Sequence, residues 1–241
     1  VLNALRTTCI QIRLIPLLLD NNINLINQSI TELANIPMIN LRVSPLFGFN
    51  KVIKYIEDKT LSFLILILIS PILLIIAAII KLTSKGPILY RQKRISWNGE
   101  EFDMLKFRSM PVDIEKKSGA KWAKAGENRA TPFGKFIRKT SLDELPQFIN
   151  VLKGDMSIVG PRPERPVFVK KFKNDIPGYM EKHLVKAGIT GWAQINGWRG
   201  NTDLQKRIEF DMYYIENWSL FFDFKIIFLT AFKGMINKNA Y

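Results

Sequence analysis

The longest apolar stretch of the chain runs from Leu61 to Ile80 without a charged side chain. As a helix, these 20 residues would match a bilayer hydrocarbon core of about 30 Å. Ser70-Pro71 lies at the centre of the stretch. Because proline removes a backbone donor, we predict a sharp kink there, with the Ser70 hydroxyl placed to satisfy the carbonyl that proline leaves free.

Basic residues flank this stretch on both sides and bear on its topology. Lys51, Lys54 and Lys59 precede it. Five more cations follow it: Lys81, Lys85, Arg91, Lys93 and Arg94. Because Lys and Arg close to a membrane segment stay on the cytoplasmic side, both ends are expected there. The sequence therefore favours a re-entrant helix-break-helix that dips into the inner leaflet and returns. A kinked span and a buried core helix are the alternatives.

Beyond the membrane stretch the pattern changes to short apolar runs separated by turn signals. Residues 88–95 and 102–107 are strand candidates joined across Asn98-Gly99, a dipeptide that favours tight turns, so a β-hairpin is predicted. A long polar loop at about 112–129 follows. From Pro132 onward the chain is predicted to be mostly helical.

The last apolar segment, residues 218–236, is rich in Phe, Ile and Leu but is interrupted by Asp223, Lys225 and Lys233. These charges disfavour a membrane span. They suit a helix in the interfacial plane, with aromatic rings at the level of the lipid headgroups. Aromatic residues that fill a protein core are an equally weighted alternative.

Three regions follow from this pattern. Residues 1–48, with a β-like apolar run at 10–19, are interpreted as the remnant of an α/β accessory domain without assigned chemistry. Residues 49–86 form the membrane hairpin with its basic approach helix, and residues 87–241 form the catalytic candidate. The predicted fold class is α+β, mainly helical, with a re-entrant membrane helix, a small β-hairpin and interfacial amphipathic helices.

Charge and cysteine content narrow the class of partner. The 241 residues carry 35 Lys and Arg against 21 Asp and Glu, a formal net charge of +14. Such an excess favours phospholipid headgroups, nucleotide phosphates or nucleic acid, and the membrane stretch makes the first two better hypotheses. The single cysteine, Cys9, excludes an internal disulfide framework. Val1 begins the chain without a cleavable leader, so a fragment or a processed chain is expected.

Two adjacent carboxylates are the leading candidates for chemistry. Ser141-Leu142-Asp143-Glu144 matches a capping box, which predicts a helix start with Pro146 in its first turn. Asp143 would then lie at a positive helix end, where free amides can receive a phosphate. Adjacent helical side chains diverge by about 100°, so we expect Asp143 and Glu144 to have separate roles. One would be a nucleophile and the other a ligand for a hard cation such as Mg²⁺. A plain helix cap is the alternative.

Basic residues near this pair are candidates for an anion pocket. Arg138 precedes it, and Arg162 follows in a loop with prolines at 161, 163 and 166, whose stiffness lowers the entropy lost on binding a diphosphate. Lys106 and Arg108, at the end of the second strand candidate, are further candidates. Each residue singly is more often a solvated surface charge. His183 is the only histidine, so no His-based metal cluster or Ser-His-Asp triad can be assembled.

Several long motifs, in order, resemble the bacterial sugar transferase family, the monotopic polyprenyl-phosphate phosphoglycosyl transferases. The resemblance runs from about residue 50 to 234. The motifs are Ser70-Pro71, Lys106-Phe107-Arg108-Ser109-Met110, Ser141-Leu142-Asp143-Glu144-Leu145-Pro146-Gln147, and residues 153–163 and 188–194.

The resemblance implies transfer of a sugar 1-phosphate from a UDP-sugar to undecaprenyl phosphate, with release of UMP. Asp143 matches the family nucleophile, which forms an aspartyl phosphosugar, and Glu144 matches the residue that holds Mg²⁺. Arg138 and Arg162 match positions similar to phosphate contacts. The expected location is the bacterial inner membrane, with the catalytic part facing the cytoplasm and anionic lipids around it.

Within the family, residues 185–188 and 196–200 resemble the branch that starts exopolysaccharide or capsule synthesis with glucose 1-phosphate. UDP-galactose or another UDP-sugar is the alternative donor. Residues 1–48 resemble the end of the extra α/β domain of long members, which usually also carry four preceding spans.

Other classes of function predict different behaviour. A non-catalytic basic membrane module would be insensitive to loss of the Asp143 charge. A nucleic-acid-binding protein has no recognised motif here, so no nucleic acid partner is expected. A single-displacement transferase or a nucleotide-sugar hydrolase would form no covalent intermediate on Asp143. A homo-oligomer is compatible with the sequence.

Overall fold

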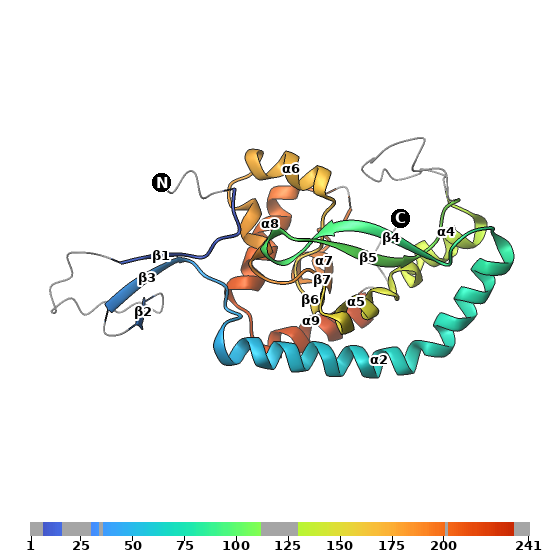
Figure 1. Cartoon of the computed structure of the whole chain (residues 1–241), viewed down its shortest axis with the longest axis horizontal. Helices are drawn as coiled ribbons and strands as arrows, with labels where there is room; N and C mark the ends of the chain where they lie inside the picture. The colour runs from blue at the N-terminus through green and yellow to red at the C-terminus, as the bar shows by residue number, and fades with distance from the viewer. Residues whose placement is uncertain (1–6, 16–29, 34–35, 112–129, 201, 234–241) are drawn as a thin grey trace.

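The computed structural model describes residues 7–15, 30–33, 36–111, 130–200 and 202–233. Within these residues the fold is mainly helical, with one long apolar helix and three small sheets. This agrees with the predicted mainly helical α+β class. Figure 1 shows the long helix along the base of the molecule, with the other helices and the hairpin above it.

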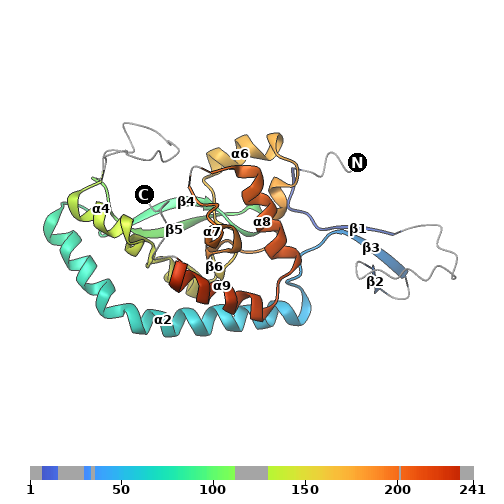
Figure 2. The ribbon, with the colours of Figure 1, turned by 180° about the vertical axis from the view of Figure 1, so that it is seen from behind.

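The long helix, α2 (Gly48–Thr83), is continuous across Pro71. The Ser70 hydroxyl donates a 2.8 Å hydrogen bond to the Ile67 carbonyl, the group that a residue other than proline at position 71 would have bonded. The predicted role of Ser70 is therefore confirmed. The helix bends in its second half, where Pro71 lies (Figures 1 and 2). It is also the one helix of the described chain whose length and composition would allow a membrane crossing.

The N-terminal region forms a three-stranded antiparallel sheet in the order β1-β3-β2. The strands are β1 (Ile12–Leu14), β2 (Ile30–Leu33) and β3 (Ile36–Arg42). The predicted apolar run at 10–19 contributes only the three residues of β1, and its end lies outside the described residues. Arg42 joins this region to the rest of the protein through a 2.7 Å ion pair with Glu181.

The predicted β-hairpin is confirmed. Strands β4 (Leu89–Ile95) and β5 (Glu101–Phe107) pair in an antiparallel manner from Leu89 with Phe107 to Ile95 with Glu101. The short helix η1 (Trp97–Gly99) closes the hairpin. Asn98 and Gly99 both have positive φ, 56° and 76°, which is the conformation that made this dipeptide a turn signal. The predicted polar loop at 112–129 lies outside the described residues.

The remainder is mostly helical, as expected, with one unpredicted sheet. Its elements are α4 (Pro132–Lys139), η2 (Leu142–Glu144), α5 (Gln147–Lys153), β6 (Ser157–Val159), α6 (Pro166–Asp175), η3 (Tyr179–Leu184), β7 (Gly188–Thr190), α7 (Trp192–Ile195), α8 (Leu204–Glu216) and α9 (Leu220–Lys233). Strands β6 and β7 pair in parallel at the centre of the main core. Each has only three residues, which is too short for a period-two pattern to reveal.

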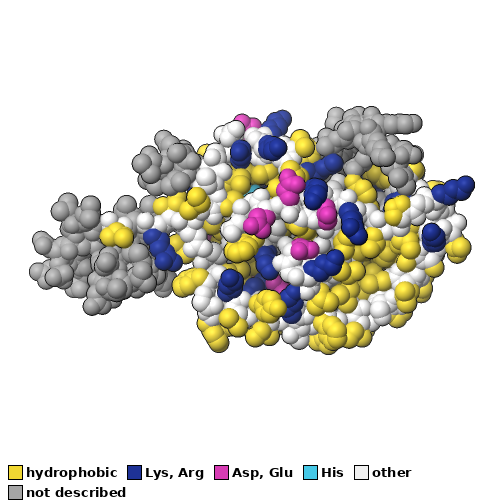
Figure 3. All heavy atoms as spheres, in the orientation of Figure 1, with side chains coloured by type: hydrophobic (Ala, Val, Ile, Leu, Met, Phe, Trp, Pro, Cys, Tyr) yellow, Lys and Arg dark blue, Asp and Glu magenta, His cyan; other side chains and the backbone are white. Residues whose placement is uncertain are grey.

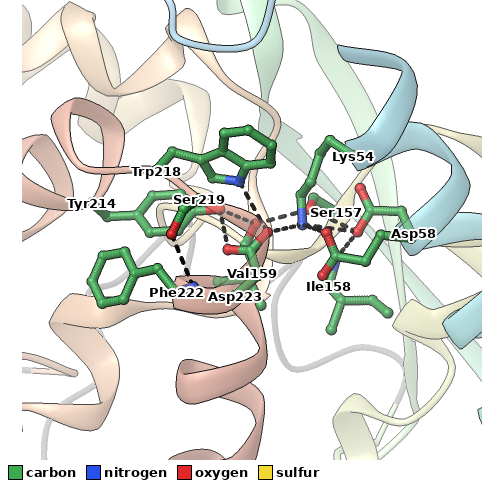
Figure 4. A network of polar contacts seen from close by, with 11 residues as sticks. Lys54, Asp58, Ser157, Ile158, Val159, Tyr214, Trp218, Ser219, Phe222 and Asp223 are labelled. Atoms are coloured by element: carbon green, nitrogen blue, oxygen red, sulfur yellow. Dashed lines mark hydrogen bonds and ion pairs between the residues drawn. The ribbon is translucent and has the colours of Figure 1, made fainter. Parts of the chain in front are cut away.

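Helix α9 corrects part of the interfacial-helix prediction. Asp223 does not face headgroups, because its side chain is fully buried and forms a 2.6 Å ion pair with Lys54 of α2. Trp218 and Tyr214 also donate hydrogen bonds to it, at 3.0 and 2.8 Å (Figure 4). The aromatic residues divide between the two alternatives. Phe222 packs on the core, whereas four others are exposed: Phe221, Phe224, Phe228 and Phe232.

Lys54 corrects the charge count at the start of α2. Instead of flanking the membrane stretch as a free cation, it is buried between Asp223 and two residues of its own helix, Glu57 and Asp58, each at 3.2 Å. Asp58 in turn accepts hydrogen bonds from the Ser157 hydroxyl and the Ile158 amide, both at 3.0 Å. This network fixes the first turns of α2 to β6 and α9 (Figure 4).

Both ends of α2 pack against the same body of the protein. Its first half contacts α5 and β6, and the Lys59 ammonium donates to the Leu152 carbonyl at the end of α5. Near its other end, Ile76 and Ile80 are buried in a cluster with Phe107 and Ile137. Between these contacts the apolar side chains are largely exposed and line the lower edge of the molecule in Figure 3.

Candidate active site

Asp143 and Glu144 lie in η2, a single 3-10 turn between α4 and α5. The capping-box prediction is wrong. Ser141 has a left-handed backbone, with φ 56°, and makes no capping hydrogen bond, while α5 begins only at Gln147. Pro146 precedes α5 rather than lying inside its first turn. The left-handed residue turns the chain back after α4, so both carboxylates point into the protein and each is only 8% exposed.

Asn150 of α5 fixes the hairpin against this turn. Its side-chain carbonyl accepts from the Leu105 amide at 2.9 Å, and its amide donates to the Asp103 carbonyl at 2.9 Å. Both groups belong to β5 and lie just before Lys106 in the sequence. An amide side chain that is 1% exposed and satisfied in this way holds one register. It thereby sets the position from which Lys106 reaches the carboxylates.

Glu144 is held by three cations from three separate segments. Its Oε1 accepts from Lys106 at 2.9 Å and from Arg162 at 2.8 Å, and its Oε2 lies 3.4 Å from an Arg199 nitrogen. Burial alone would raise the pKa of Glu144. The charges of Arg162, Lys106 and Arg199 outweigh burial and hold that pKa well below its usual range. Glu144 is therefore a carboxylate at every working pH.

Asp143 has the opposite surroundings. No described residue donates a hydrogen bond to its carboxylate or pairs with it. Burial, and next the charge of Glu144, raise the pKa of Asp143 to about 6. Lys106, Arg138 and Arg199 oppose this shift. A carboxylate without a bonded partner keeps its lone pairs available, so Asp143 is the better nucleophile of the two.

The Arg162 loop is fixed by a close approach of backbones. Gly160 donates to the Thr190 carbonyl at 2.9 Å, and Gly188 donates to the Pro161 carbonyl at 2.9 Å. A Cβ on Gly188 would lie 2.1 Å from the Gly160 nitrogen, so no larger residue fits there. The parallel pair β6 and β7 thus sets the start of the loop that carries Arg162.

The predicted site residues have different outcomes. The structure brings Lys106 and Arg162 to Glu144, and Arg138 is close enough to influence the pKa of Asp143. Arg108 lies elsewhere, because it donates to the carbonyl and hydroxyl of Ser84, at 2.9 and 2.6 Å, and so fixes the end of α2. Arg199 was not predicted. It lies 55 residues beyond Glu144 in the chain, and only its place in a Trp-Arg-Gly segment singled it out.

His183, the only histidine of the sequence, lies in the protein interior. It is 3% exposed, and burial lowers its pKa to about 3, so it is neutral. Among the described residues no three His, Cys, Asp or Glu side chains form a metal-binding group. The ionised Glu144 nevertheless suits Mg²⁺, which commonly binds one or two carboxylates together with substrate phosphates and water. A cation there would replace at least one of the three basic contacts.

A buried carboxylate pair faced by arginines is typical of sites that bind phosphate groups, and the same protein carries a helix long enough to enter a bilayer. Comparison with known proteins narrows this class. The model of the bacterial sugar transferase family matches residues 49–237, so the chain belongs to that family. The match covers α2 and every element of the site.

Individual relatives are similar over most of the chain. A UDP-glucose:undecaprenyl-phosphate glucose-1-phosphate transferase of Escherichia coli K12 is 49% identical over 98% of the chain and 51% of its own length. The protein of the same name in Klebsiella pneumoniae is 52% identical over 90% of the chain and 48% of its length. A UDP-N-acetylgalactosamine-undecaprenyl-phosphate N-acetylgalactosaminephosphotransferase of Aeromonas hydrophila is 46% identical over 78% and 44%. The chain thus spans about half the length of these relatives.

Proposed function

We propose that the protein transfers a hexose 1-phosphate from a UDP-sugar to undecaprenyl phosphate, giving undecaprenyl-diphosphate sugar and UMP. UDP-glucose is the favoured donor, since two of the relatives above are named for that reaction. The Aeromonas relative is named for a different sugar, so the identity of the donor is tested with a panel of UDP-sugars below. The reaction would begin exopolysaccharide or capsule synthesis.

The contrast between the two carboxylates carries this proposal. Asp143 has no bonded partner among the described residues and a pKa raised to about 6, so at neutral pH it is mostly ionised and still basic enough to attack. Glu144 is committed to Lys106, Arg162 and Arg199. A nucleophile beside a fixed cluster of cations is what displacement at a diphosphate requires, because negative charge grows on the departing phosphate.

The reaction would occur in two displacements. An Asp143 oxygen attacks the sugar-bearing phosphorus, a carboxyl–phosphate bond forms, and the bond to the bridging oxygen breaks, so UMP leaves with its electron pair. A phosphate oxygen of undecaprenyl phosphate then attacks the same phosphorus, and Asp143 departs as a carboxylate. Arg162, Arg199 and Arg138 would bind the diphosphate oxygens and orient the phosphorus toward Asp143.

We further propose Mg²⁺ as the cofactor, with Glu144 as its protein ligand. When bound, the ion supplies charge neutralisation at the diphosphate. Lys106 and the arginines would then contact the substrate oxygens instead of Glu144. These oxygens are negatively charged, as the Glu144 carboxylate is. The low pKa of Glu144 means that no proton has to leave before the ion binds.

The acceptor phosphate lies at the level of the lipid headgroups, which explains the membrane helix. We propose that α2 is re-entrant in the inner membrane and that the catalytic part faces the cytoplasm. Two observations support this topology: both ends of α2 pack on one body, and the helix bends in the half that contains Pro71. Exposed lysines at the two ends, including Lys51 and Lys85, would contact anionic lipids.

UMP release tests the function. The protein, reconstituted in membranes with undecaprenyl phosphate and Mg²⁺, would be offered a panel of UDP-sugars. Release from one sugar, lost in both Asp143→Asn and Glu144→Gln, is the expected result. Asp175→Asn serves as the control, since this carboxylate ends α6 outside the site. No release from any sugar by a folded, membrane-bound sample would contradict the proposed function of this chain.

Trapping separates double from single displacement. Incubation with a radiolabelled UDP-sugar without lipid acceptor should leave label on the protein, released by a later addition of undecaprenyl phosphate. The label should be absent from Asp143→Asn. Turnover without any labelled protein would exclude the covalent intermediate and favour direct transfer.

A further inference from the structure

Arg207 of α8 is a buried cation without a place in the chemistry proposed above. Its side chain is 3% exposed, and none of its hydrogen bonds or ion pairs involves Asp143 or Glu144. A buried guanidinium is costly unless its donors are satisfied. Where those donors go is therefore informative about its role.

The two ends of the Arg207 guanidinium hold two different loops. NH1 donates to Glu164 Oε1 at 3.0 Å. NH2 donates to the Gly200 carbonyl at 2.6 Å and to the Thr202 hydroxyl at 3.0 Å. Glu164 is two residues beyond Arg162, and Gly200 directly follows Arg199. Arg207 thus holds in place the two segments that carry Arg162 and Arg199.

These contacts close a ring that begins and ends at Glu144. Arg162 reaches Oε1 of Glu144 at 2.8 Å and Arg199 reaches Oε2 at 3.4 Å. Behind them, Glu164 and Gly200 meet on Arg207. On the side away from Glu144, the Arg162 and Arg199 segments are therefore held by the planar guanidinium of Arg207, which can donate hydrogen bonds in two directions at once.

Glu164 is itself fixed from a second side. Its backbone carbonyl accepts from the Ile95 amide at 2.9 Å, and Arg94 of β4 donates to the neighbouring Pro163 carbonyl at 3.1 Å. The hairpin therefore supports the Arg162 loop independently of α8. The turn around Gly200 is bonded within its own stretch of chain, by the Trp198 amide to the Ala193 carbonyl at 3.0 Å and by the Thr202 amide to the Gly200 carbonyl at 3.1 Å.

We propose that Arg207 is a positioning residue that sets the spacing of Arg162 and Arg199 around the substrate phosphates. The inference rests on the proposed function for its catalytic consequence but not for its structural one. Lysine at this position keeps the charge, yet its single ammonium cannot donate along both directions of the guanidinium fork. Because the hairpin also holds the Arg162 loop, the turn that carries Arg199 should be the more affected.

Activity is the first arm of the test. Arg207→Lys is expected to lower kcat/KM for the UDP-sugar by about 100-fold, the scale of a displacement of about 1 Å in a reacting group. Glu164→Gln should lower it less, because the hairpin contacts remain. Glu209→Gln makes the same chemical change on an exposed position of α8 and should be silent. An Arg207→Lys variant within twofold of the parent would overturn the proposal.

A split between kcat and KM distinguishes positioning from loss of folded enzyme. Displaced phosphate contacts should change KM for the UDP-sugar as well as kcat, whereas a smaller folded fraction would lower kcat and leave KM unchanged. That second pattern would also overturn the proposal.

Hydrogen exchange gives an arm that needs no activity. In Arg207→Lys, amides of residues 196–200 should exchange faster than in the parent, those of 160–165 to a smaller extent, and those of α5 at an unchanged rate. Faster exchange throughout the protein would show a general structural role instead. If the parent has no turnover with any UDP-sugar, the proposed function fails, while this arm still decides whether Arg207 positions the two loops.

Discussion

At the scale of single residues, Asp143 and Glu144 show how neighbours in sequence acquire opposite chemistry. The 3-10 turn points both carboxylates inward, but the three cations from β5, the Arg162 loop and the Arg199 turn all reach Glu144. Asp143 bears the cost of burial with only the unbonded charges of Lys106, Arg138 and Arg199 to oppose it. Its raised pKa indicates a carboxylate that no described cation pairs with and that is therefore available to react.

Activity should therefore have an acid limb set by Asp143. Its pKa of about 6 means that kcat/KM falls about tenfold per pH unit well below that value, as the nucleophile becomes protonated. Lys106→Met removes a charge that lowers this pKa, so the limb should move to higher pH. Lys93→Met, on the exposed face of the hairpin, is the control. A limb at the same pH in Lys106→Met and the parent would contradict this assignment.

Stability should respond to the two carboxylates in opposite directions. Since the folded pKa of Asp143 lies above the unfolded value, the folded state binds the extra proton. The cost of ionisation therefore develops as pH rises from about 4 to 6, and reaches on the order of 3 kcal/mol. Asp143→Asn should raise the unfolding temperature at pH 8 but not at pH 4. Glu144→Gln, which leaves three half-buried cations without their shared partner, should lower it at pH 8.

Thermal unfolding of both variants in the same membrane mimetic measures this contrast. Both variants should be inactive, so activity alone cannot separate them. A lower unfolding temperature for Asp143→Asn at pH 8 would show that Asp143 is paired in the folded protein.

At the scale of elements, the buried network around Lys54 joins α2 to α9 and β6. One lysine serves three carboxylates, from Glu57, Asp58 and Asp223. Two of these share its helix, and the third comes from the opposite end of the chain. The network therefore links α2 to α9, the last helix of the described residues, and it depends on all four side chains together.

Removal of Lys54 should be far more damaging than a surface charge change. Lys54→Met leaves three buried carboxylates without a cation, and we expect a loss of about 3–5 kcal/mol in the free energy of unfolding. Lys51→Met, three residues earlier and exposed, should change it by less than about 0.5 kcal/mol. Denaturant unfolding followed by Trp fluorescence would measure both. Equal effects of the two substitutions would show that the network contributes nothing.

The correct predictions concern features that depend on residues close together in the chain. Asn98-Gly99 fixes the hairpin by its own backbone preference, and Ser70 bonds the carbonyl that its neighbour Pro71 leaves free. The errors have distant causes. Lys54 was counted as a surface cation because its partner, Asp223, lies 169 residues away, and Arg108 was placed in the site because the end of α2 that it binds could not be located.

The candidate site was likewise predictable where its residues belong to local motifs, and not where tertiary packing brings them in. The acidic pair and the proline-stiffened Arg162 loop are visible as motifs. Arg199 is brought in by the packing of α7 and α8, and the capping box failed because Ser141 adopts a left-handed turn that no local pattern required. Convergence of three segments on one carboxylate is a property of the tertiary fold.

At the scale of the whole molecule, the position of α2 decides how the protein meets a bilayer. Both ends of the helix return to one body, which a straight crossing of about 30 Å would prevent. In a Cys9→Ser background, cysteines at positions 51 and 85 should react with an impermeant maleimide from the cytoplasmic side only. Labelling of the two positions from opposite sides would establish a span and refute the re-entrant proposal. Cysteine at exposed position 170 marks the cytoplasmic side.

The bend of α2 has a mechanical consequence as well. A helix that enters and leaves through one leaflet adds area to that leaflet alone, unlike a span, which adds to both. Such an insertion relieves tension where the lipids are spread and is resisted where they are crowded. We therefore expect the protein to partition more strongly into small, highly curved vesicles than into large ones of the same lipids, as a flotation assay would measure. Membrane curvature would then influence where on the membrane the sugar phosphate is transferred.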